Sequence, residues 1–288
     1  MAIWNLGSIN IDVVFSVPHI PSPGETLGST GRKIFLGGKG TNMSVAVARA
    51  GSRVSHIGAV GADGQWTVDR LMENGVDTRF IAETEEGTGQ ALIAVDAQGE
   101  NTIILYPGAN HAIPLTNLQN ALSEAETGDR FVFQNETTLQ AEAAKLAKEM
   151  GLAVTYAAAP FDADAVKAVL PFCEMLFLNE VEARQLTEAT GQSPADLPVD
   201  DVVITLGSKG CDWVTSRGTT HFDAMKVDPV DTTGAGDTFT GYVLAGLDQG
   251  MPMGQAIEQA TRAAALMVTR HGTSDVIPDL SEVRAFRM

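Results

Sequence analysis

The residues best suited to chemistry in this sequence lie in a late glycine turn, where Gly234, Ala235 and Gly236 lead directly into Asp237. Glycine lacks a side chain and tolerates positive φ, so backbone N–H groups in such a turn can approach a ligand closely. An apolar segment with helical spacing follows, and a helix start attracts anions. This arrangement suits phosphoryl transfer, with the N–H groups stabilising the moving phosphate and Asp237 accepting the proton of an alcohol.

Two features of this prediction stay open at the level of sequence. A helix start keeps Asp237 ionised and therefore makes it a weak base, which a loose transition state tolerates. Asp237 is also compatible with a plain N-cap, and the glycines with a simple tight turn.

Two earlier polar stretches have residue types that bind an alcohol. In "GSINID", Asn10 and Asp12 are two residues apart on a β-like run, so their side chains share a face and can bind neighbouring hydroxyls of a sugar. In "FLGGKGTNMS", Lys39 and Asn42 are spaced i, i+3 at the start of a helix-like run and can face one ligand. Solvated strand-end residues and an ordinary glycine turn are the alternatives.

Two later stretches predict a nucleotide site. Asn179 ends a β-like run and is followed by Glu180 and Glu182. Carboxylate and amide groups near a triphosphate usually act through Mg²⁺ and its waters, although acidic residues are also common at exposed helix starts. The stretch "TLGSKG" (205–210) follows another β-like run and has two glycines and Lys209, as expected for a nucleotide-binding turn.

Composition narrows the class of protein. The formal charge of −17 disfavours nucleic acid as a partner. We find no apolar run near the roughly 20 residues of a membrane span and no secretory signal at the start, so we expect no membrane partner. The two cysteines, Cys173 and Cys211, lie in no ligand-like cluster and fit the reducing cytoplasm, and the scattered histidines disfavour zinc.

Strand-like and helix-like runs alternate along most of the chain. Predicted strands are residues 2–9, 53–61, 130–134, 153–160, 175–179 and 201–207, and predicted helices are residues 40–51, 65–75 and 138–151. The strands are nearly continuous in apolar residues, as in strands that are covered on both faces. The pattern predicts one α/β domain over residues 1–288, with a doubly wound, mainly parallel sheet and helices on both faces.

One part of the chain breaks this alternation. Residues 90–110 contain two β runs around "DAQGEN" and predict a hairpin, and residues 12–28 lean towards β structure without a helix. We expect a small separate sheet, a lid, with segments at about 12–36 and 88–108. The apolar run 103–105 does not alternate, which is compatible both with a lid packed on a second subunit and with an ordinary surface hairpin.

Together these stretches resemble the ribokinase family of ATP-dependent carbohydrate kinases. The resemblance runs in order through "GSINID", "PSPGET", "GGKGTN", "GENTIILYPGAN", "FQNE", "NEVEA", "TLGSKG", "DTTGAGDTF" and "AAALMVTRHG". "GGKGTN" and "DTTGAGDTF" are highly specific when both occur at this separation. The resemblance implies a doubly wound sheet, a β lid that often forms a homodimer interface, ATP, Mg²⁺ and an activating K⁺.

The resemblance also assigns roles to individual residues. The sugar would contact Asn10, Asp12, Gly37, Gly38, Lys39, Asn42 and Glu136, with Asp237 as the base and Gly234, Ala235 and Gly236 as the anion hole. The nucleotide would contact Asn179, Thr205, Gly207, Ser208, Gly210 and Gly236. Glu182 would reach Mg²⁺ through water, and Asp231, Thr233, Met267, Arg270 and Gly272 would hold K⁺, mostly through backbone carbonyls.

The predicted reaction is transfer of the γ-phosphate of MgATP to a primary hydroxyl of a pentose, D-ribose giving ribose 5-phosphate. Fructose, a 2-keto-3-deoxy sugar acid and a nucleoside are alternative substrates. A catalytically silent sugar-binding protein on the same fold is the rival from another class, and the intact Asp237 and glycine turn argue against it.

Overall fold

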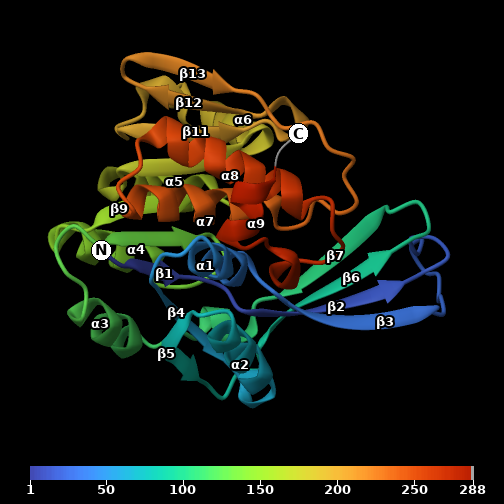
Figure 1. Cartoon of the computed structure of the whole chain (residues 1–288). Coiled ribbons are helices and arrows are strands. Elements are labelled where there is room, and N and C mark those ends of the chain that lie inside the picture. Colours follow the sequence, from blue (N-terminus) through green and yellow to red (C-terminus); the bar gives the residue numbers. More distant parts are fainter. Residues whose placement is uncertain (287–288) are drawn as a thin grey trace.

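The computed structural model describes residues 1–286, and its centre is a nine-stranded sheet of order β13-β12-β11-β10-β9-β8-β1-β4-β5 (Figure 1). The strands are β1 (Ile3–Leu6), β4 (Val54–Val60), β5 (Asp77–Glu83), β8 (Arg130–Gln134), β9 (Ala153–Ala157), β10 (Met175–Asn179), β11 (Asp201–Thr205), β12 (Cys211–Thr215) and β13 (Gly218–Phe222). The run from β5 to β11 is parallel, while β12 and β13 are antiparallel.

Helices cover both faces of this sheet. One face carries α1 (Lys39–Arg49), α2 (Gln65–Glu73), α7 (Ala235–Asp248), α8 (Met253–Met267) and α9 (Leu280–Ala285), and the other carries α3 (Leu115–Ser123), α4 (Gln140–Glu149), α5 (Ala163–Val169) and α6 (Glu180–Thr190). Short 3-10 turns occupy Ala62–Gly64, Gly108–His111, Leu170–Phe172, Pro194–Asp196, Gly207–Lys209 and Ser274–Val276. Strand alternation produces two cores: Ile3 packs on the first face, and Trp4 and Leu6 on the second.

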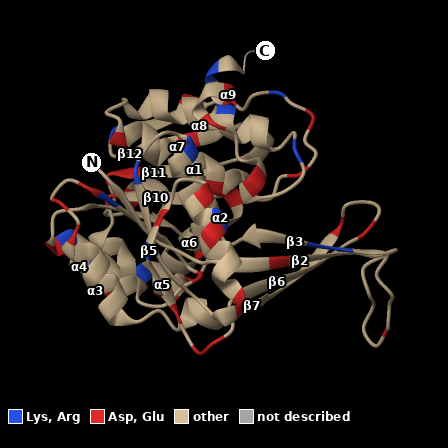
Figure 2. Ribbon diagram, turned by 60° about the horizontal axis from the view of Figure 1, so that its bottom comes forward, with Lys and Arg blue, Asp and Glu red and all other residues tan. Residues whose placement is uncertain are grey.

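This arrangement confirms the predicted fold class. The near-continuous apolar runs of the parallel strands are explained by the two cores, since alternate side chains of each strand are buried against helices on opposite faces. Among the described helices, none is long and apolar enough to cross a bilayer. Acidic residues are spread along the ribbon (Figure 2). In the sequence they outnumber basic residues by 36 to 19, in keeping with the formal charge of −17.

A second sheet projects from the main body and forms the lid. It has the order β3-β2-β6-β7, with β2 (Asn10–Ser16), β3 (Gly31–Gly37), β6 (Gly89–Val95) and β7 (Asn101–Tyr106) (Figure 1). The pairing of β6 with β7 is antiparallel, which confirms the predicted hairpin. The separate lid sheet is therefore present, built from two pieces of chain that are far apart in the sequence.

Two boundaries of the predicted strands are wrong. The first strand ends at Leu6, and "GSINID" does not extend it; the chain leaves the main sheet at residues 7–9 and enters the lid as β2. The β-leaning segment 12–28 is a strand only as far as Ser16. Pro18, Pro21 and Pro23 follow, and a residue without an N–H group cannot donate to a ladder, so the second lid strand begins only at residue 31.

A buried polar network fixes the start of α1 against the main sheet. Asn5 on β1 donates from Nδ2 to Gly40 O and to Ser44 Oγ, both at 2.8 Å. His56 on β4 lies 2.9 Å from Ser44 Oγ through Nδ1 and 3.0 Å from Gly7 O through Nε2. Since a carbonyl only accepts, Nε2 carries the proton and Nδ1 accepts from Ser44, so the imidazole is neutral.

Burial lowers the pKa of His56 from 6.5 to about 4. An unfolded chain would bind a proton at His56 as the pH falls below 6.5, whereas the folded chain would not do so until about pH 4. His56 therefore favours folding fully above pH 6.5, and this contribution is lost as the pH falls towards 4, by about 3 kcal/mol at 1.36 kcal/mol per pKa unit.

We predict that His56→Gln, which stays neutral at every pH, removes this acid sensitivity. The stability advantage of the wild-type protein over the variant should shrink by about 1–2 kcal/mol between pH 7.5 and pH 5, because only the wild type has an imidazole to protonate on unfolding. Urea denaturation at the two pH values measures the difference. A constant difference would mean that the buried imidazole is not neutral in the folded state.

Candidate active site

The predicted site residues converge at one edge of the main sheet. The carboxyl ends of the parallel strands β1, β8, β10 and β11 lie at this edge, and the segments with Ser8, Glu136, Asn179 and Gly207 follow them directly. In open α/β sheets this edge is the usual place for ligands. The lid begins at the same edge, since β2 follows β1 after three residues.

Asp237 lies at the centre of the site. Asn42 donates from Nδ2 to Asp237 Oδ2 at 2.9 Å, and the carboxylate is only 7% exposed. Burial raises the pKa of Asp237, and the nearby Lys39 ammonium opposes that rise. Asp237 in turn is the main cause of a raised pKa at Lys39, so the two opposite charges attract each other across the starts of α1 and α7.

This electrostatic environment corrects one expectation. The helix start was expected to keep Asp237 a weak base, but burial moves its pKa upward and thus makes the carboxylate a stronger proton acceptor. Close packing of two helices creates the burial: a Cβ atom on Gly241 of α7 would lie 2.8 Å from Met43 O of α1, so only glycine allows this approach. Asn42 Oδ1 is buried without a partner among the described residues and is free to accept a hydroxyl hydrogen.

The glycine turn (Thr232–Gly236) precedes Asp237 and opens α7. Gly234 has φ of 76°, a left-handed conformation that favours glycine. The amide of Ala235 donates to Thr232 O at 3.2 Å, so this N–H group closes the turn. Within residues 1–286, the amides of Gly236 and Asp237 have no backbone acceptor, and these N–H groups rather than that of Ala235 are free for an anion.

A second group of polar residues, the carboxylate cluster, lies near Lys39. It consists of the carboxylates of Asp12 and Glu136, the Ser8 hydroxyl and the Lys39 amide. Glu136 accepts hydrogen bonds from Ser8 Oγ and, at 3.2 Å, from the Lys39 N–H group. Burial raises the pKa of Glu136, against the influence of Lys39. Burial, with a smaller contribution from Glu136, also raises the pKa of Asp12 to about 7.

The backbone around this cluster is shaped by glycine. Gly37 pairs with Asn10 across β2 and β3, and a Cβ atom on Gly37 would collide with the Asp12 carboxylate. Asn10 Oδ1 accepts a hydrogen bond of 2.8 Å from Asn110 Nδ2, and Asn110 Oδ1 accepts the Ile9 amide at 2.9 Å. Asn110 was missed as a site residue, although it ends the motif "GENTIILYPGAN"; its role depends on a long-range contact that spacing does not reveal.

An apolar cavity of about 370 Å³ adjoins the glycine turn. Of the residues predicted to contact the nucleotide, Thr205, Gly207, Ser208, Gly210 and Gly236 line it. Sequence reasoning missed most of the remaining lining residues, which include Ala224, Met225, Val227, Pro229, Thr232, Phe239, Ala264, Ala265 and Val268. The volume and the apolar lining suit the flat heteroaromatic base of a nucleotide, whose phosphates would then reach the turn.

Asn179 and Glu182 form a capping box at the start of α6. Asn179 Oδ1 accepts the Glu182 amide at 2.9 Å, and Glu182 Oε2 accepts the Asn179 amide at 2.8 Å. Asn179 does not line the apolar cavity. Glu182 nevertheless belongs to the site electrostatically: burial raises its pKa, and Lys39 and Asp237 both act on it.

The residues predicted for K⁺ lie next to the glycine turn. Asp231 accepts the Thr233 amide at 2.9 Å through Oδ1 and the Gly272 amide at 3.3 Å through Oδ2. The side chains of Met267 and Arg270 are engaged elsewhere, by Thr238 and by Glu282. Backbone carbonyls are therefore the groups that remain for a cation there. Within residues 1–286, no three His, Cys, Asp or Glu side chains form a cluster able to hold a metal.

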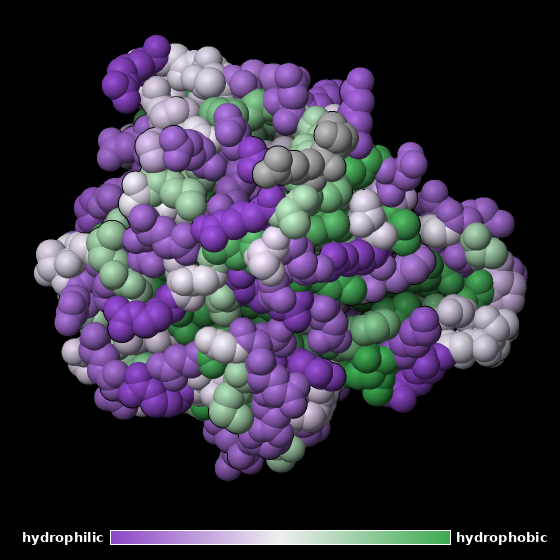
Figure 3. All heavy atoms as spheres, viewed as in Figure 1, coloured by the Kyte–Doolittle hydropathy of each residue, from purple (hydrophilic) through white to green (hydrophobic). Residues whose placement is uncertain are grey.

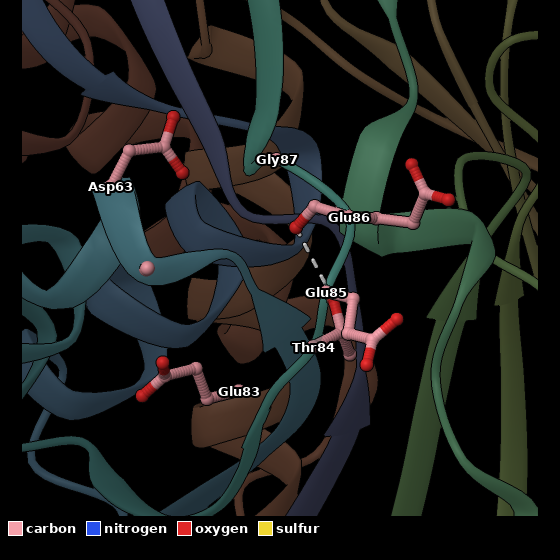
Figure 4. A pocket seen from close by; sticks show the side chains of 7 residues that line it. Asp63, Glu83, Thr84, Glu85, Glu86 and Gly87 are labelled. Carbon is pink, nitrogen blue, oxygen red and sulfur yellow. Dashed lines mark hydrogen bonds between the residues drawn. The ribbon is translucent and has the colours of Figure 1, made fainter.

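A larger hollow of about 600 Å³ is lined by acidic residues and lies apart from Asp237. It is formed where β5 leads into the lid, and Figure 4 shows the side chains of Glu83, Glu85 and Glu86 around it. Thr84 Oγ1 donates to Glu86 O at 3.3 Å. These carboxylates would repel the phosphates of a nucleotide, so the apolar cavity is the better candidate for a nucleotide.

Comparison with known proteins places the chain in a family. Residues 3–280 match the model of the pfkB family carbohydrate kinases, and the chain belongs to this family. A ribokinase from Staphylococcus aureus is 35% identical over 297 residues, which cover 96% of this chain and 97% of the relative. The protein is thus a carbohydrate kinase of the pfkB family.

Solved structures give the same result for the fold. Ribokinase from Thermotoga maritima superposes with a TM-score of 0.90 at 32% identity, covering 99% of this chain and 98% of that chain. Arabidopsis thaliana ribokinase, solved as a complex with ribose and ATP, superposes with a TM-score of 0.87 at 25% identity, covering 99% and 98%. The nine-stranded sheet with a separate lid sheet is therefore the architecture of ribokinases.

The raised pKa of Asp12 has a consequence for stability. Its pKa is about 7 in the folded protein and 3.8 without the fold, so the carboxylate opposes folding fully above pH 7 and not at all below pH 3.8. At 1.36 kcal/mol per unit the penalty is at most about 4 kcal/mol.

We predict that Asp12→Asn stabilises the ligand-free protein at pH 8 and that this gain is about 2 kcal/mol smaller at pH 5, where wild-type Asp12 is already protonated. Urea unfolding at both pH values measures it. Asp164→Asn, an exposed acid in the first turn of α5, serves as the control and should change stability by less than about 0.5 kcal/mol. A gain that is equal at the two pH values would contradict the assignment.

Proposed function

We propose that this protein transfers the γ-phosphate of ATP to the primary hydroxyl of D-ribose, giving ribose 5-phosphate. The observation that carries the proposal is the burial of Asp237 at a helix start with free amides, directly after Gly236 of the apolar cavity and near Lys39, whose amide belongs to the carboxylate cluster. The sugar would bind at the carboxylate cluster, the adenine in the apolar cavity and the transferred phosphate at the amides of Gly236 and Asp237.

Asp237 would act as the general base. Its upward-shifted pKa makes it a better proton acceptor than an exposed aspartate, while the nearby Lys39 ammonium opposes that rise and so favours the ionised form. Asn42 holds Oδ2, so Oδ1 is the oxygen that faces the incoming hydroxyl. Phosphoryl transfer depends mainly on alignment and charge stabilisation, and a base held on one side by an amide is suited to aligning an alcohol.

The cluster also indicates which carbohydrates fit. The carboxylates of buried Asp12 and partly buried Glu136 can accept hydrogen bonds from neighbouring sugar hydroxyls, with Asn10 next to Asp12 on β2. A sugar acid would add a third carboxylate near both, and the nearby cation, Lys39, already balances the charge of Asp237, which disfavours a sugar acid. The likeness to ribokinases at 35% identity favours ribose over fructose or a nucleoside.

The metal ions fit this chemistry through oxygen ligands. Mg²⁺ bound to the triphosphate would neutralise charge on the transferred phosphate. Glu182 is the carboxylate placed for it: Oε2 caps Asn179, which leaves Oε1 for a metal-bound water. A monovalent cation such as K⁺ would be held beside Asp231 by backbone carbonyls of Thr233, Met267, Arg270 and Gly272.

The test is a coupled ADP-release assay with ATP and Mg²⁺ over D-ribose, 2-deoxy-D-ribose, D-fructose, a 2-keto-3-deoxy sugar acid and inosine. We predict the highest kcat/KM for D-ribose. Asp237→Asn should lower kcat by a factor of about 10²–10⁴ and leave ribose affinity within a few fold, because only the proton acceptor is lost. Near-normal turnover of Asp237→Asn would refute the role of Asp237 as the base. A higher kcat/KM for another substrate would refute the assignment of D-ribose.

We further propose that the protein is a homodimer through the lid. Every residue of β7 is exposed in one chain, and Ile34, Leu92, Ile103, Ile104, Leu105 and Tyr106 are among the most exposed large hydrophobic residues. Figure 3 shows hydrophobic surface on the lid. Residues 103 to 105 alternate between the two faces of the sheet, so a second copy that clasps the lid would cover side chains on both faces.

Ile104→Lys should therefore convert a dimer into a monomer, because Ile104 is 64% exposed on β7 and a charge there cannot be buried without a partner. Light scattering coupled to size exclusion at micromolar concentration measures the mass. Leu115→Lys, at an exposed leucine of α3 on the main body, is the matched control and should remain dimeric. A monomeric wild-type protein would exclude the lid dimer.

A further inference from the structure

The loop between α8 and α9 contacts the base of the lid through two buried hydroxyl groups. Thr273 Oγ1 and Ser274 Oγ both donate to the carbonyl oxygen of Leu36, each at 2.9 Å. Thr273 is 8% exposed, Ser274 is fully buried, and Leu36 is 1% exposed. Two side chains thus converge on a single carbonyl that lies more than two hundred residues earlier in the chain.

Leu36 is directly connected to the carboxylate cluster. It is the penultimate residue of β3, which is an edge strand of the lid, and the chain continues through Gly37 and Gly38 to Lys39. Gly37 lies against the Asp12 carboxylate, and the Lys39 amide donates to Glu136. The position of the Leu36 carbonyl therefore sets the backbone on which the proposed sugar site is built.

The other end of the same loop is connected to the glycine turn. The Gly272 amide donates to Asp231 Oδ2 at 3.3 Å, and the Asp231 amide donates to Val268 O at 3.2 Å. Asp231 Oδ1 accepts the Thr233 amide, one residue before Gly234. Val268 itself lines the apolar cavity. A group bound at the cavity or at the turn therefore touches backbone that is hydrogen-bonded to this loop.

The loop is held as a unit between these two ends. Arg49 of α1 donates from Nη1 to Asp275 O at 3.2 Å and also to Ile277 O. Arg270 donates to Val276 O at 3.3 Å and pairs with Glu282 at 2.7 Å. Because its carbonyls are tied to guanidinium groups, a shift of Gly272 would move Thr273 and Ser274 rather than be absorbed within the loop.

We propose that Thr273 and Ser274 are positioning residues that couple nucleotide binding to the geometry of the sugar site, so that each ligand binds more tightly when the other is present. This inference rests on the proposed function, since it needs both ligands. Coupling of this kind is reciprocal and is measured as the ratio of the sugar dissociation constants without and with nucleotide. A purely structural role for the two hydroxyls would lower stability and leave that ratio unchanged.

The test uses a double variant that carries both Thr273→Val and Ser274→Ala. It is compared with the wild type and with a matched control, Thr269→Val. Thr269→Val removes a hydroxyl of the same loop that donates to Leu266 O at 2.7 Å and not to the lid. Calorimetric titration with D-ribose, without and with saturating ADP and Mg²⁺, gives the ratio for each protein. We expect about 5- to 50-fold tightening in the wild type and in Thr269→Val, and less than about twofold in the double variant.

Thermal unfolding of each variant shows whether it is folded at the temperature of the titration. If the double variant is not folded, Ser274→Ala is tested alone. It removes one of the two donors and keeps the other, so the ratio should be at least about threefold smaller than that of the wild type. A folded variant that retains the wild-type ratio overturns the inference, as does a wild-type ratio of one.

The substrate panel separates this outcome from failure of the proposed function. If the wild type phosphorylates D-ribose and the variant keeps full coupling, only the inference fails. If the wild type prefers another sugar, the ribose assignment fails and the ratio is measured with that sugar. If no sugar is phosphorylated, both are rejected.

Discussion

The hydrogen bond from Asn42 to Asp237, with Lys39 beside it, joins the starts of two helices that are nearly two hundred residues apart in the sequence. An ionised carboxylate that is 7% exposed is unfavourable unless it is paired and hydrogen-bonded. Asn42 supplies the hydrogen bond, and Lys39 supplies a nearby positive charge. They do so only if α1 and α7 pack closely, which the absence of a side chain at Gly241 allows.

Much of the surrounding structure serves this contact. The network of Asn5, Ser44 and His56 ties the first turns of α1 to β1 and β4 and thereby fixes where Lys39 and Asn42 begin. The buried imidazole remains neutral, so the network adds no charge near Lys39 and Asp237. A polar interior of this kind contributes to positioning rather than to hydrophobic stability, since each group is satisfied by another side chain or by the backbone.

The carboxylate cluster shows the opposite balance. Asp12 is buried and Glu136 partly buried, both have a pKa that is raised chiefly by burial, and each has a glutamate or aspartate nearby that adds to the effect. Such a pair opposes folding in the absence of a ligand and becomes favourable when hydroxyl groups donate to it. Functional sites commonly retain destabilising groups for this reason, and their cost is offset by the two cores of the sheet.

The sequence was sufficient to predict the parts of the site that depend on short-range geometry. Asn10 and Asp12 share a face because strands alternate, and Lys39 and Asn42 lie together because helical spacing brings them there. The alternation of apolar runs was likewise enough to predict the doubly wound sheet. Strand ends were less certain: β1 stops at Leu6 because the chain must leave one sheet for another, a tertiary constraint that no local pattern contains.

What the sequence could not give are properties that arise from packing between distant segments. Part of the wall of the apolar cavity comes from an irregular loop, Ala224 to Pro229, which has no motif. The pKa of Asp237 was predicted in the wrong direction because a helix start considered alone lowers it, whereas enclosure by α1 raises it. The distinction matters for mechanism, because the same residue would be a poor base in an open turn and becomes a more effective one when the second helix excludes water from it.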